Sequence, residues 1–405
     1  MAQADILILG GGLVGSALGT ALDAHGISSI IVDLADPEVI LAAAHDGRAS
    51  AVASAPHRML HAIGVGERLG TQGCPIESIR VSDGLKPGKL DFTVGEDEDA
   101  LGVMYENRVL RRALYESAKA APRVDLRMQT RALSVTRDAH GVTAELSDGS
   151  TVRASLLVGA EGRNSPTRDA ALLRVARWQY DHAAIVTAFH HEYSHENTAF
   201  EIFYPEGPFA LLPLNDDAQG HRSAVVWTVR RDQAPGMLKL SERGVLAEAM
   251  KKTGGFLGEL SRLGPRSTYP LGFHHAAHIT ADRLALVGDA AHGIHPIAGQ
   301  GVNVGFRDVA ALVEVLVDGK RLGLEPGDAQ LLKRYERWRS LDTMMVSLAT
   351  DGLTRLFGMP GRTAHAVRRF GLNAVDRIPP LKDMFMAEAR GESGAVPKLL
   401  QGMTA

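Results

Sequence analysis

A short apolar run that leads into glycines is the clearest hydrophobic pattern near the start of the chain. The run ends at Leu9, and Gly10-x-Gly12-x-x-Gly15 follows before apolar positions resume at helical spacing. A second apolar run then ends in Asp33. Strand, glycine turn, helix, strand and acid in this order predict a dinucleotide-binding unit. The glycines let the backbone approach a pyrophosphate, and the acid can bond a ribose hydroxyl.

A similar pattern recurs far along the chain. The apolar run 284–287 ends at Gly288-Asp289, and a loop rich in glycine and proline leads to Val302. From there, apolar residues recur at spacings of three and four, which predicts a helix. A helix N-terminus offers unpaired N–H groups, so this stretch predicts a second cradle for a cofactor.

Between the two cradles, the apolar residues alternate with polar ones, which is typical of half-buried strands. Alternating runs occur within 76–94 and 183–268, and Asp148-Gly149 between two other runs predicts a hairpin turn. We expect antiparallel strands that form a sheet with one solvated face and one covered face.

The last part of the chain returns to helical spacing. An apolar stripe runs from Met345 to Phe357, and residues 351–405 hold 8 Lys/Arg against 5 Asp/Glu, a net charge of +3. A basic, partly amphipathic tail can lie on an anionic membrane. Packing on the cofactor domain or on a second subunit is the alternative, and the sequence leaves both open.

The amino-acid composition is that of a globular enzyme and argues against several other classes of protein. The 405 residues are 45% apolar and 22% charged, which is ordinary for a globular enzyme and long enough for two or more domains. A net charge of -3 gives no electrostatic case for nucleic acid. The single cysteine, Cys74, excludes a disulfide framework and fits a reducing cytoplasm. No secretory signal is expected, and no apolar run reaches the roughly 18 residues of a membrane span.

Three further motifs accompany the two cradles: Asp46-Gly-Arg48, Tyr105-Glu-Asn107-Arg108, and the stretch from Leu156 to Ser165. Together they resemble the flavin-dependent aromatic hydroxylases of the p-hydroxybenzoate hydroxylase type. Within that family, the sequences of residues 292–301 and 206–214 are similar to those of the ubiquinone-biosynthesis hydroxylases. The resemblance extends over essentially the whole chain.

The resemblance implies an α/β fold with a Rossmann-like FAD-binding domain, an inserted antiparallel-sheet substrate domain and a C-terminal helical region. The expected FAD-binding domain is discontinuous and comprises 1–75, 102–182 and 269–335. The expected substrate domain comprises 76–101 and 183–268, and the helical region comprises 336–405.

By resemblance, the cofactor is FAD, and a phenol-type ring is hydroxylated through a flavin C4a-hydroperoxide. The substrate is expected to be a polyprenylated phenol of ubiquinone biosynthesis, with O2 and with NAD(P)H or a redox protein as electron donor. The expected cofactor-binding residues are Gly10, Gly12, Gly15, Asp33, Arg48, Asn107, Arg108, Gly288, Asp289, Pro296, Gly299, Gly301, Val302 and Asn303. His295 is the candidate catalytic side chain. Asn107 is also expected to cap the helix that it opens.

Some points stay open at the level of sequence. Glu161 stands where the family carries aspartate, which changes the position of its carboxylate. His292 and His295 lack the spacing of metal ligands on a helix, so no metal is expected. A flavin oxidoreductase of another aromatic or lipid substrate, and a silent FAD-binding subunit of a biosynthetic complex, are the alternative functions. We expect a cytoplasmic protein, with peripheral contact at the inner face of the membrane as a further hypothesis.

Overall fold

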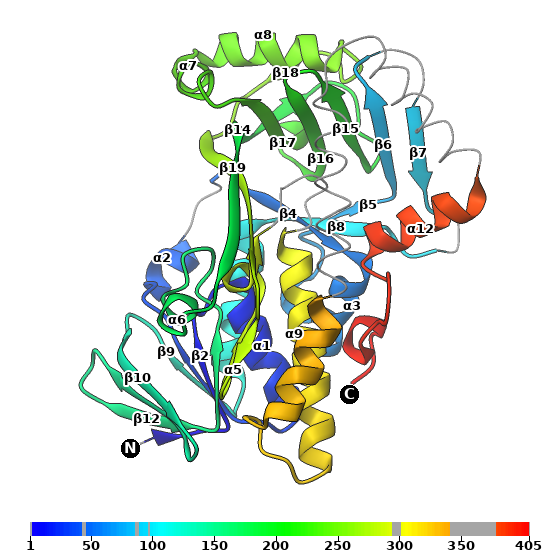
Figure 1. Ribbon diagram of the computed structural model, residues 1–405. Coiled ribbons are helices and arrows are strands. Elements are labelled where there is room, and N and C mark those ends of the chain that lie inside the picture. Colours follow the sequence, from blue (N-terminus) through cyan, green and yellow to red (C-terminus); the bar gives the residue numbers. More distant parts are fainter. Residues whose placement is uncertain are drawn as a thin grey trace.

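The computed structural model describes residues 2–42, 46–85, 89–95, 98–293, 301–340 and 378–404. Figure 1 shows two large sheets, one in the lower and one in the upper half of the molecule, joined by the long strands β14 and β19. Helices pack beside the lower sheet, and α8 lies across the top of the upper sheet.

The lower sheet has six strands in the order β20-β21-β13-β2-β3-β9. All neighbours are parallel except β20 and β21. The bounds are β2 Ile6–Leu9, β3 Ser29–Val32, β9 Val124–Arg127, β13 Leu156–Gly159, β20 Thr280–Ala281 and β21 Leu284–Leu286. Strand β2 is entirely buried, as its uninterrupted apolar sequence predicts for a central parallel strand. Strands β2, β3, β13 and β21 confirm the strands expected from the sequence.

Three helices form the main packing layer beside this sheet. They are α1 Leu13–Ala24, α5 Asn107–Ala120 and α9 Gly301–Arg321. Helix α1 contacts both α5 and α9. The apolar positions predicted for the helix after the second glycine turn, which is α9, include Val309 and Leu312 and are completely buried. This sheet and these helices therefore fix the positions of both glycine turns.

A small four-stranded sheet extends the lower half. Its order is β1-β12-β11-β10, with bounds β1 Ala2–Gln3, β10 Ala132–Asp138, β11 Gly141–Leu146 and β12 Thr151–Ala154. Strands β11 and β12 are antiparallel, and Gly149 between them has a φ of +82°. The hairpin predicted from Asp148-Gly149 is therefore confirmed.

The upper sheet has nine strands, ordered β22-β19-β14-β17-β16-β15-β6-β7, with β18 also pairing with β14. The bounds are β6 Ser78–Asp83, β7 Lys89–Thr93, β14 Val175–His191, β15 Thr198–Tyr204, β16 Gly207–Asp217, β17 Gly220–Arg230, β18 Leu260–Ser261, β19 Ser267–Ala276 and β22 His292–Gly293. The expectation of a purely antiparallel sheet was wrong at one place, because β15 and β6 are parallel. These strands come from distant parts of the chain, so no short turn forces them to be antiparallel.

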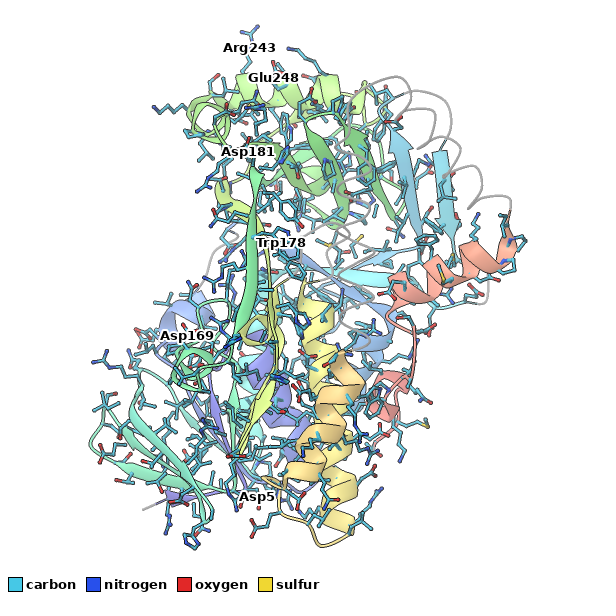
Figure 2. The ribbon with its side chains drawn as sticks, viewed as in Figure 1. Asp5, Asp169, Trp178, Asp181, Arg243 and Glu248 are labelled. Atoms are coloured by element: carbon cyan, nitrogen blue, oxygen red, sulfur yellow. The ribbon has the colours of Figure 1, made fainter. Side chains whose placement is uncertain are left out.

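Strand β14 runs from the lower half into the upper half. Trp178 lies on its lower stretch and Asp181 further up, as Figure 2 shows. The Trp178 ring stacks on Phe273 of β19, with centroids 4.0 Å apart. The domain boundary predicted between 182 and 183 falls inside this strand, where its register with β19 shifts. The predicted division into domains remains a prediction.

Two helices that the alternating pattern did not predict cover the outer face of the upper sheet. They are α7 Ala234–Lys239 and α8 Glu242–Thr253. Val245 and Ala249 of α8 pack in one apolar cluster with Phe200 and Trp227 of the sheet. Interpreting the whole of 183–268 as strands was therefore wrong for the segment after β17.

Beneath the upper sheet lies a three-stranded sheet of order β4-β8-β5. The strands are β4 Ala49–Ala53, β5 Cys74–Ile76 and β8 Gly102–Glu106. Cys74 is buried in a cluster that also contains Ala199 and Ala224 of the upper sheet, so it packs between the two sheets. We call the face of the upper sheet that carries these alanines its inner face.

The remaining described elements are α2 Pro37–Ala42, α3 Ser54–Ala62, α4 Gly66–Leu69, α6 Pro166–Ala170, η1 Gly288–Ala290, a helical segment at 329–340, α12 Pro379–Arg390 and η3 Lys398–Gln401. The apolar stripe predicted from Met345 to Phe357 lies outside the described residues. Among the residues that are described, no helix is long and apolar enough to cross a membrane.

Candidate cofactor site

The first glycine turn contains two glycines that the protein's own packing requires. Gly10 has a φ of +103°, and a Cβ there would lie 2.4 Å from the carbonyl oxygen of Ala160. A Cβ on Gly15 would lie 1.8 Å from the carbonyl oxygen of Gly10. Both contacts are far closer than real carbon atoms approach, so these two glycines let α1 pack tightly against β2 and β13.

Gly12 differs from these two glycines. Its φ is −69°, which any residue adopts, and no described protein atom lies within 4 Å of the place that its Cβ would take. Gly12 is also the N-cap of α1 and has no side chain to bond the free N–H groups of the first turn. The described chain thus gives no reason for glycine here. The open space and the free N–H groups fit a phosphate group.

A cleft of about 850 Å³ opens at the carboxyl ends of the central strands and is lined by Gly10, Asp33, Glu161 and residues of β10. Leu34 and Leu133 also line it and are 66% and 59% exposed. In a parallel sheet, ligands bind in the crevice outside the carboxyl ends of the strands. The combination of the Asp33 carboxylate and exposed apolar side chains fits a nucleoside, which has hydroxyls at one end and a flat apolar base at the other.

The Asp33 carboxylate is oriented by the backbone at both oxygens. Oδ2 accepts a hydrogen bond from the N–H of Gly11, and Oδ1 accepts one of 2.7 Å from the N–H of Ala35. These bonds hold the acid beside the glycine turn and at the edge of the cleft.

Glu161 uses its extra methylene to reach a neighbouring helix start. Its Oε2 accepts hydrogen bonds from the Ser165 hydroxyl at 2.6 Å and from the N–H of Thr167 at 3.3 Å. Ser165 is itself the N-cap of α6. The Glu161 carboxylate is therefore held against α6, at the rim of the cleft.

The second glycine turn lies against the first. Gly288 has a φ of +59°, and its N–H donates a 2.8 Å hydrogen bond to Oδ2 of Asp308 on α9. Val14 of α1 packs against Gly288 and Gly305, and a Cβ on Gly305 would lie 2.6 Å from the Val14 side chain. Glycine at these positions lets η1, α1 and α9 converge.

Asp289 follows at the surface of this junction. Its side chain is exposed, although the carboxylate lies in a recess of the protein, and burial in that recess raises its pKa while Arg163 opposes the rise. No side-chain hydrogen bond to Asp289 is found within the described part of the chain. Its carbonyl oxygen lies 2.7 Å from Nε2 of His274, whose pKa burial lowers to about 4. His274 is therefore neutral at pH 7 and donates this hydrogen bond.

Behind the turn, Asp308 is fully buried between two basic side chains. Arg339 donates a 2.6 Å hydrogen bond to Oδ1, and Nε2 of His292 lies 2.9 Å from Oδ2. Burial alone would raise the pKa of Asp308, but the attraction of His292 and Arg339 outweighs it and holds that pKa below its usual value. The acid thus joins η1, α9 and the helical segment at 329–340.

The start of α9 is fixed to the three-stranded sheet. The Asn303 side chain accepts a 2.9 Å hydrogen bond from the N–H of Ala53 and donates one of 2.9 Å to the carbonyl of Ala51. This amide completes the edge of β4, so its own role is structural, while the backbone N–H groups of Gly301 and Val302 lie in the first turn of the helix. His295, Pro296 and Gly299 lie outside the described residues.

Comparison with known proteins identifies the cofactor. A family model described as an FAD binding domain matches residues 3–346. The chain is 45% identical over 403 residues to ubiquinone hydroxylase UbiL of Rhodospirillum rubrum, which covers 99% of this chain and 93% of the relative. This chain belongs to the FAD-binding family of flavin-dependent monooxygenases. FAD is its cofactor.

Two further comparisons agree with this membership. The 3-demethoxyubiquinol 3-hydroxylase of Escherichia coli is 32% identical over 390 residues, covering 96% of this chain and 98% of that protein. The p-nitrophenol 4-monooxygenase PnpA of Pseudomonas putida superimposes with a TM-score of 0.78 over 97% of this chain and 99% of that one, at 18% identity. The latter confirms the fold expected for this class of FAD-binding monooxygenase.

The side chain of Arg48, which is expected to lie along the cofactor, is fixed by an ion pair with Asp46. Its Nη2 lies 2.6 Å from Oδ2 of Asp46, which also accepts a 3.1 Å hydrogen bond from Arg111. Burial tends to raise the pKa of Asp46, but these arginines lower it to about 2. Between the two residues, Gly47 has a φ of +80°, and a Cβ there would lie 2.5 Å from the carbonyl of Pro265.

Asn107 and Arg108 open α5, but the expectation that Asn107 caps the helix was wrong. The N-cap is Glu106, and the Asn107 side chain instead accepts a 2.7 Å hydrogen bond from the Ser50 hydroxyl. Arg108 donates to Glu106, which also forms a 2.8 Å ion pair with Arg222 of the upper sheet. The asparagine faces a strand rather than the helix end because β4, which the sequence did not reveal, lies next to it.

Two residues near the second turn were missed at the level of sequence. Arg163 opposes the rise in pKa that burial causes at both Asp289 and Tyr269, so its charge lies near both side chains. The second missed residue is Asp308, which binds His292 and Arg339 in the protein interior. Its signal was available, because an acid four residues after Val304 and four before Leu312 falls on the apolar face of α9. No group of three or more metal-binding side chains is found within the described ranges.

Proposed function

We propose that this FAD-dependent monooxygenase hydroxylates the aromatic ring of a polyprenylated phenol in ubiquinone biosynthesis. The observation that carries the proposal is the 45% identity, over nearly the whole length of both chains, to a ubiquinone hydroxylase. A second relative of matching length is a 3-demethoxyubiquinol 3-hydroxylase. O2 and a reduced electron donor, NAD(P)H or a redox protein, complete the reaction.

The first glycine turn would bind the adenosine diphosphate part of FAD. The N–H groups at the start of α1 would face the pyrophosphate across the space beside Gly12, with Gly10 and Gly15 keeping the turn closed. Asp33 at the edge of the 850 Å³ cleft would bond the ribose. Exposed Leu34 and Leu133 support this arrangement, since the adenine ring would cover them.

The second turn would bind the remainder of the cofactor. Gly288 and Asp289 would face the ribityl and pyrophosphate region, and the N–H groups of Val302 and Asn303 would face the edge of the flavin ring. Pro296, Gly299 and Gly301 would border that ring, with Arg48, Asn107 and Arg108 along the cofactor. Reduced FAD supplies the activated oxygen. The positive end of α9 would stabilise negative charge on the ring.

The inner face of the upper sheet would form the wall of the substrate pocket. Alanines recur on this face, including Ala188, Ala199 and Ala224, and leave room for an aromatic ring. An apolar wall would also exclude water from the reacting oxygen. His295 is retained as a proposed polar group near the ring.

The test is turnover by the FAD-loaded protein of a short-chain prenylated phenol with O2 and NAD(P)H, followed by identification of the oxidised ring carbon. Incorporation of one atom from ¹⁸O2 into the ring supports the proposal. Reduction of a quinone without oxygen incorporation would identify a reductase. A flavin that is reduced but transfers no oxygen to any phenol would identify a silent subunit.

We further propose that the enzyme meets its substrate at a membrane surface, because polyprenylated phenols are nearly insoluble in water. The net charge of +3 in 351–405 supports this, at roughly 1 kcal/mol per basic residue near an anionic surface. Co-sedimentation with anionic liposomes should weaken in the double variant Arg368→Glu/Arg369→Glu and at high salt. Unchanged sedimentation and long-chain turnover would reject membrane docking in favour of packing or a protein complex.

A further inference from the structure

Glu201 stands on an apolar part of the inner face formed by β15 and its neighbours, and Asp83, two positions beyond Val81 on β6, lies on the same face. Side chains alternate along β15, so Phe200 and Ile202 face α8, while Ala199, Glu201 and Phe203 face the other way. Ala199 packs in the cluster that joins the inner face to the three-stranded sheet. Glu201 therefore lies on the wall proposed for the substrate pocket.

The direct neighbours of Glu201 across the sheet carry no charge. In register, it lies beside Ala210 of β16 and Val81 of β6. No hydrogen bond or ion pair to its carboxylate is found among the residues that the structure describes. Burial in these surroundings raises its pKa to about 7, although part of the side chain remains open to solvent.

The charged groups on the two flanking strands are engaged elsewhere. Arg80 lies over the Phe200 ring, on the opposite face, and pairs with Asp91. Asp216 and Asp217 lie at the far end of β16 and pair with histidines. The last charged group is Asp83, at the end of β6 and in register with Phe203; it has an interaction of its own.

An unpaired carboxylate in such a place is unfavourable for folding. Burial of a charge without a partner costs free energy, and most buried polar groups in proteins have hydrogen-bond partners. Packing therefore does not explain why the strand carries an acid between Phe200 and Ile202. A carboxylate with a pKa near neutrality is instead suited to accept a proton from a bound ligand.

Building on the proposed function, we propose that Glu201 is the catalytic base that removes the proton from the phenolic hydroxyl of the substrate. The phenolic O–H bond breaks, an O–H bond forms on the carboxylate, and the electron pair stays on the phenolic oxygen. The ring becomes richer in electrons and attacks one oxygen atom of the O2 that reduced FAD activates: the C–O bond forms as the O–O bond breaks, and the second oxygen atom leaves as water after taking up the two electrons that reduced FAD supplies. The attacked ring carbon then loses its hydrogen as a proton to water, and Glu201 returns its proton to the product oxygen.

The proposal rests on position as well as chemistry. Strand β4 packs against the inner face through Ala49 and Ala51, and the same strand binds the first turn of α9 through Asn303. The proposed location of the flavin edge is thus separated from the inner face by a single strand of small residues. A phenol that enters beside this strand, with its ring toward the flavin edge, would have its hydroxyl end toward Glu201.

The experiment compares Glu201→Gln with Glu206→Gln in the FAD-loaded enzyme. Glu206 is exposed, lies at the turn after β15 and pairs with Lys252, so it serves as the matched control. The readouts are FAD content, flavin reduction, hydroxylated product per O2 consumed, and the ultraviolet spectrum of bound phenol. The two substrates are a short-chain prenylated phenol and a counterpart that carries enough ring fluorine to ionise in water at pH 8 without a base.

General base catalysis typically contributes about 10²–10⁴-fold, so Glu201→Gln should slow hydroxylation of the plain phenol by at least about 100-fold. Flavin reduction and FAD content should be unchanged, and the fluorinated phenol should be hydroxylated at near the wild-type rate. Wild-type hydroxylation should rise as pH increases through about 7, where Glu201 ionises, and the variant should lack this rise. The phenolate absorption band should appear on binding to wild type only.

Two outcomes would overturn the role of Glu201 while leaving the proposed function intact. One is an unchanged hydroxylation rate and spectrum in Glu201→Gln. The other is an equal loss with both phenols, which would indicate a structural lesion. If wild type hydroxylates no phenol at all, the proposed function itself fails, and the assignment of Glu201 falls with it.

Discussion

The two glycine turns and the inner face of the upper sheet use the polypeptide in opposite ways. At the turns, the chain offers backbone N–H groups and space, with Gly12 open and Gly10 closed by contact with Ala160. On the inner face, the backbone groups are used in sheet hydrogen bonds, and only side chains such as Glu201 can face a ligand. A cofactor shared by a whole family suits backbone recognition, whereas the choice of substrate is left to side chains.

The largest effect is expected when a side chain fills the open space beside Gly12 in the first turn. Gly12→Val should fold normally, because no described atom lies within 4 Å of its Cβ, yet it should lower FAD affinity by at least about 1,000-fold, roughly 4 kcal/mol. Gly15→Val should not fold, because its Cβ would lie 1.8 Å from a carbonyl oxygen. Thermal unfolding of the FAD-free proteins and fluorescence titration with FAD measure both. Tight FAD binding by Gly12→Val would show that the space is not the pyrophosphate site.

A large effect on stability alone is expected behind the second turn. Arg339→Met leaves Asp308 buried without one of its two basic partners, and breaking such a buried pair costs about 3–5 kcal/mol. The matched control on the same helical segment is Arg334→Met, whose exposed pair with Asp318 should contribute about 0–1 kcal/mol.

The pH dependence of this pair has a definite sign. The pKa of Asp308 is lower in the folded than in the unfolded protein, so its contribution is present at neutral pH and is lost as pH falls through that lowered value. Urea unfolding at pH 7 and at pH values well below 3.8, the ordinary pKa of an aspartate, should therefore show a larger difference between wild type and Arg339→Met at pH 7. Equal stability of the two arginine variants at pH 7 would reject a strong buried pair.

The sequence predicted those elements whose signals lie within a few consecutive residues. Strand β2, the glycine turn and α9 were predicted because their apolar periods and glycines lie within a few consecutive residues. Strand β4 was missed because it consists of alanine, serine and valine, of which only Val52 favours strands. Its register with β8 is set by tertiary packing, which no short window contains.

The sequence predicted that the glycines and acids lie at strand ends, but not which residues they contact. Asp33 follows β3 directly and Asp289 lies three residues after β21, so their positions could be predicted from the strand ends. The parallel pairing of β15 with β6, which places Val81 beside Glu201, joins segments more than 100 residues apart and has no sequence signature. Alternation nevertheless predicts that Glu201 faces away from Phe200, and an acid within an apolar strand was a signal that could have been used.

A smaller effect is expected at Asp289, and it concerns the cofactor rather than the fold. Asp289→Ala should weaken FAD binding by about 1.5–3 kcal/mol, the range for a hydrogen bond to a charged group. The FAD-free variant should be no less stable than wild type, because the side chain is exposed and its raised pKa shows that ionisation is unfavourable in the fold. Isothermal titration with FAD and thermal unfolding without it separate the two effects. An unchanged dissociation constant would remove Asp289 from the cofactor site.

The smallest expected effect links the inner face to folding. Burial raises the pKa of Glu201 from 4.5 to about 7, so the folded protein holds a proton that the unfolded chain releases between these values. Stability should therefore fall as pH rises from about 4.5 to about 7, by at most about 3 kcal/mol and by less because the side chain is partly open to solvent. Glu201→Gln removes this penalty and should be about 1–2 kcal/mol more stable than wild type at pH 8, but equal to it at pH 4.

Denaturant unfolding of the FAD-free proteins at both pH values provides the measurement, with Glu206→Gln expected to match wild type throughout. A variant that is less stable at pH 8 would mean that the carboxylate has a stabilising partner, and Glu201 would then resemble the turn residues, which are explained by packing, rather than a side chain kept for a ligand.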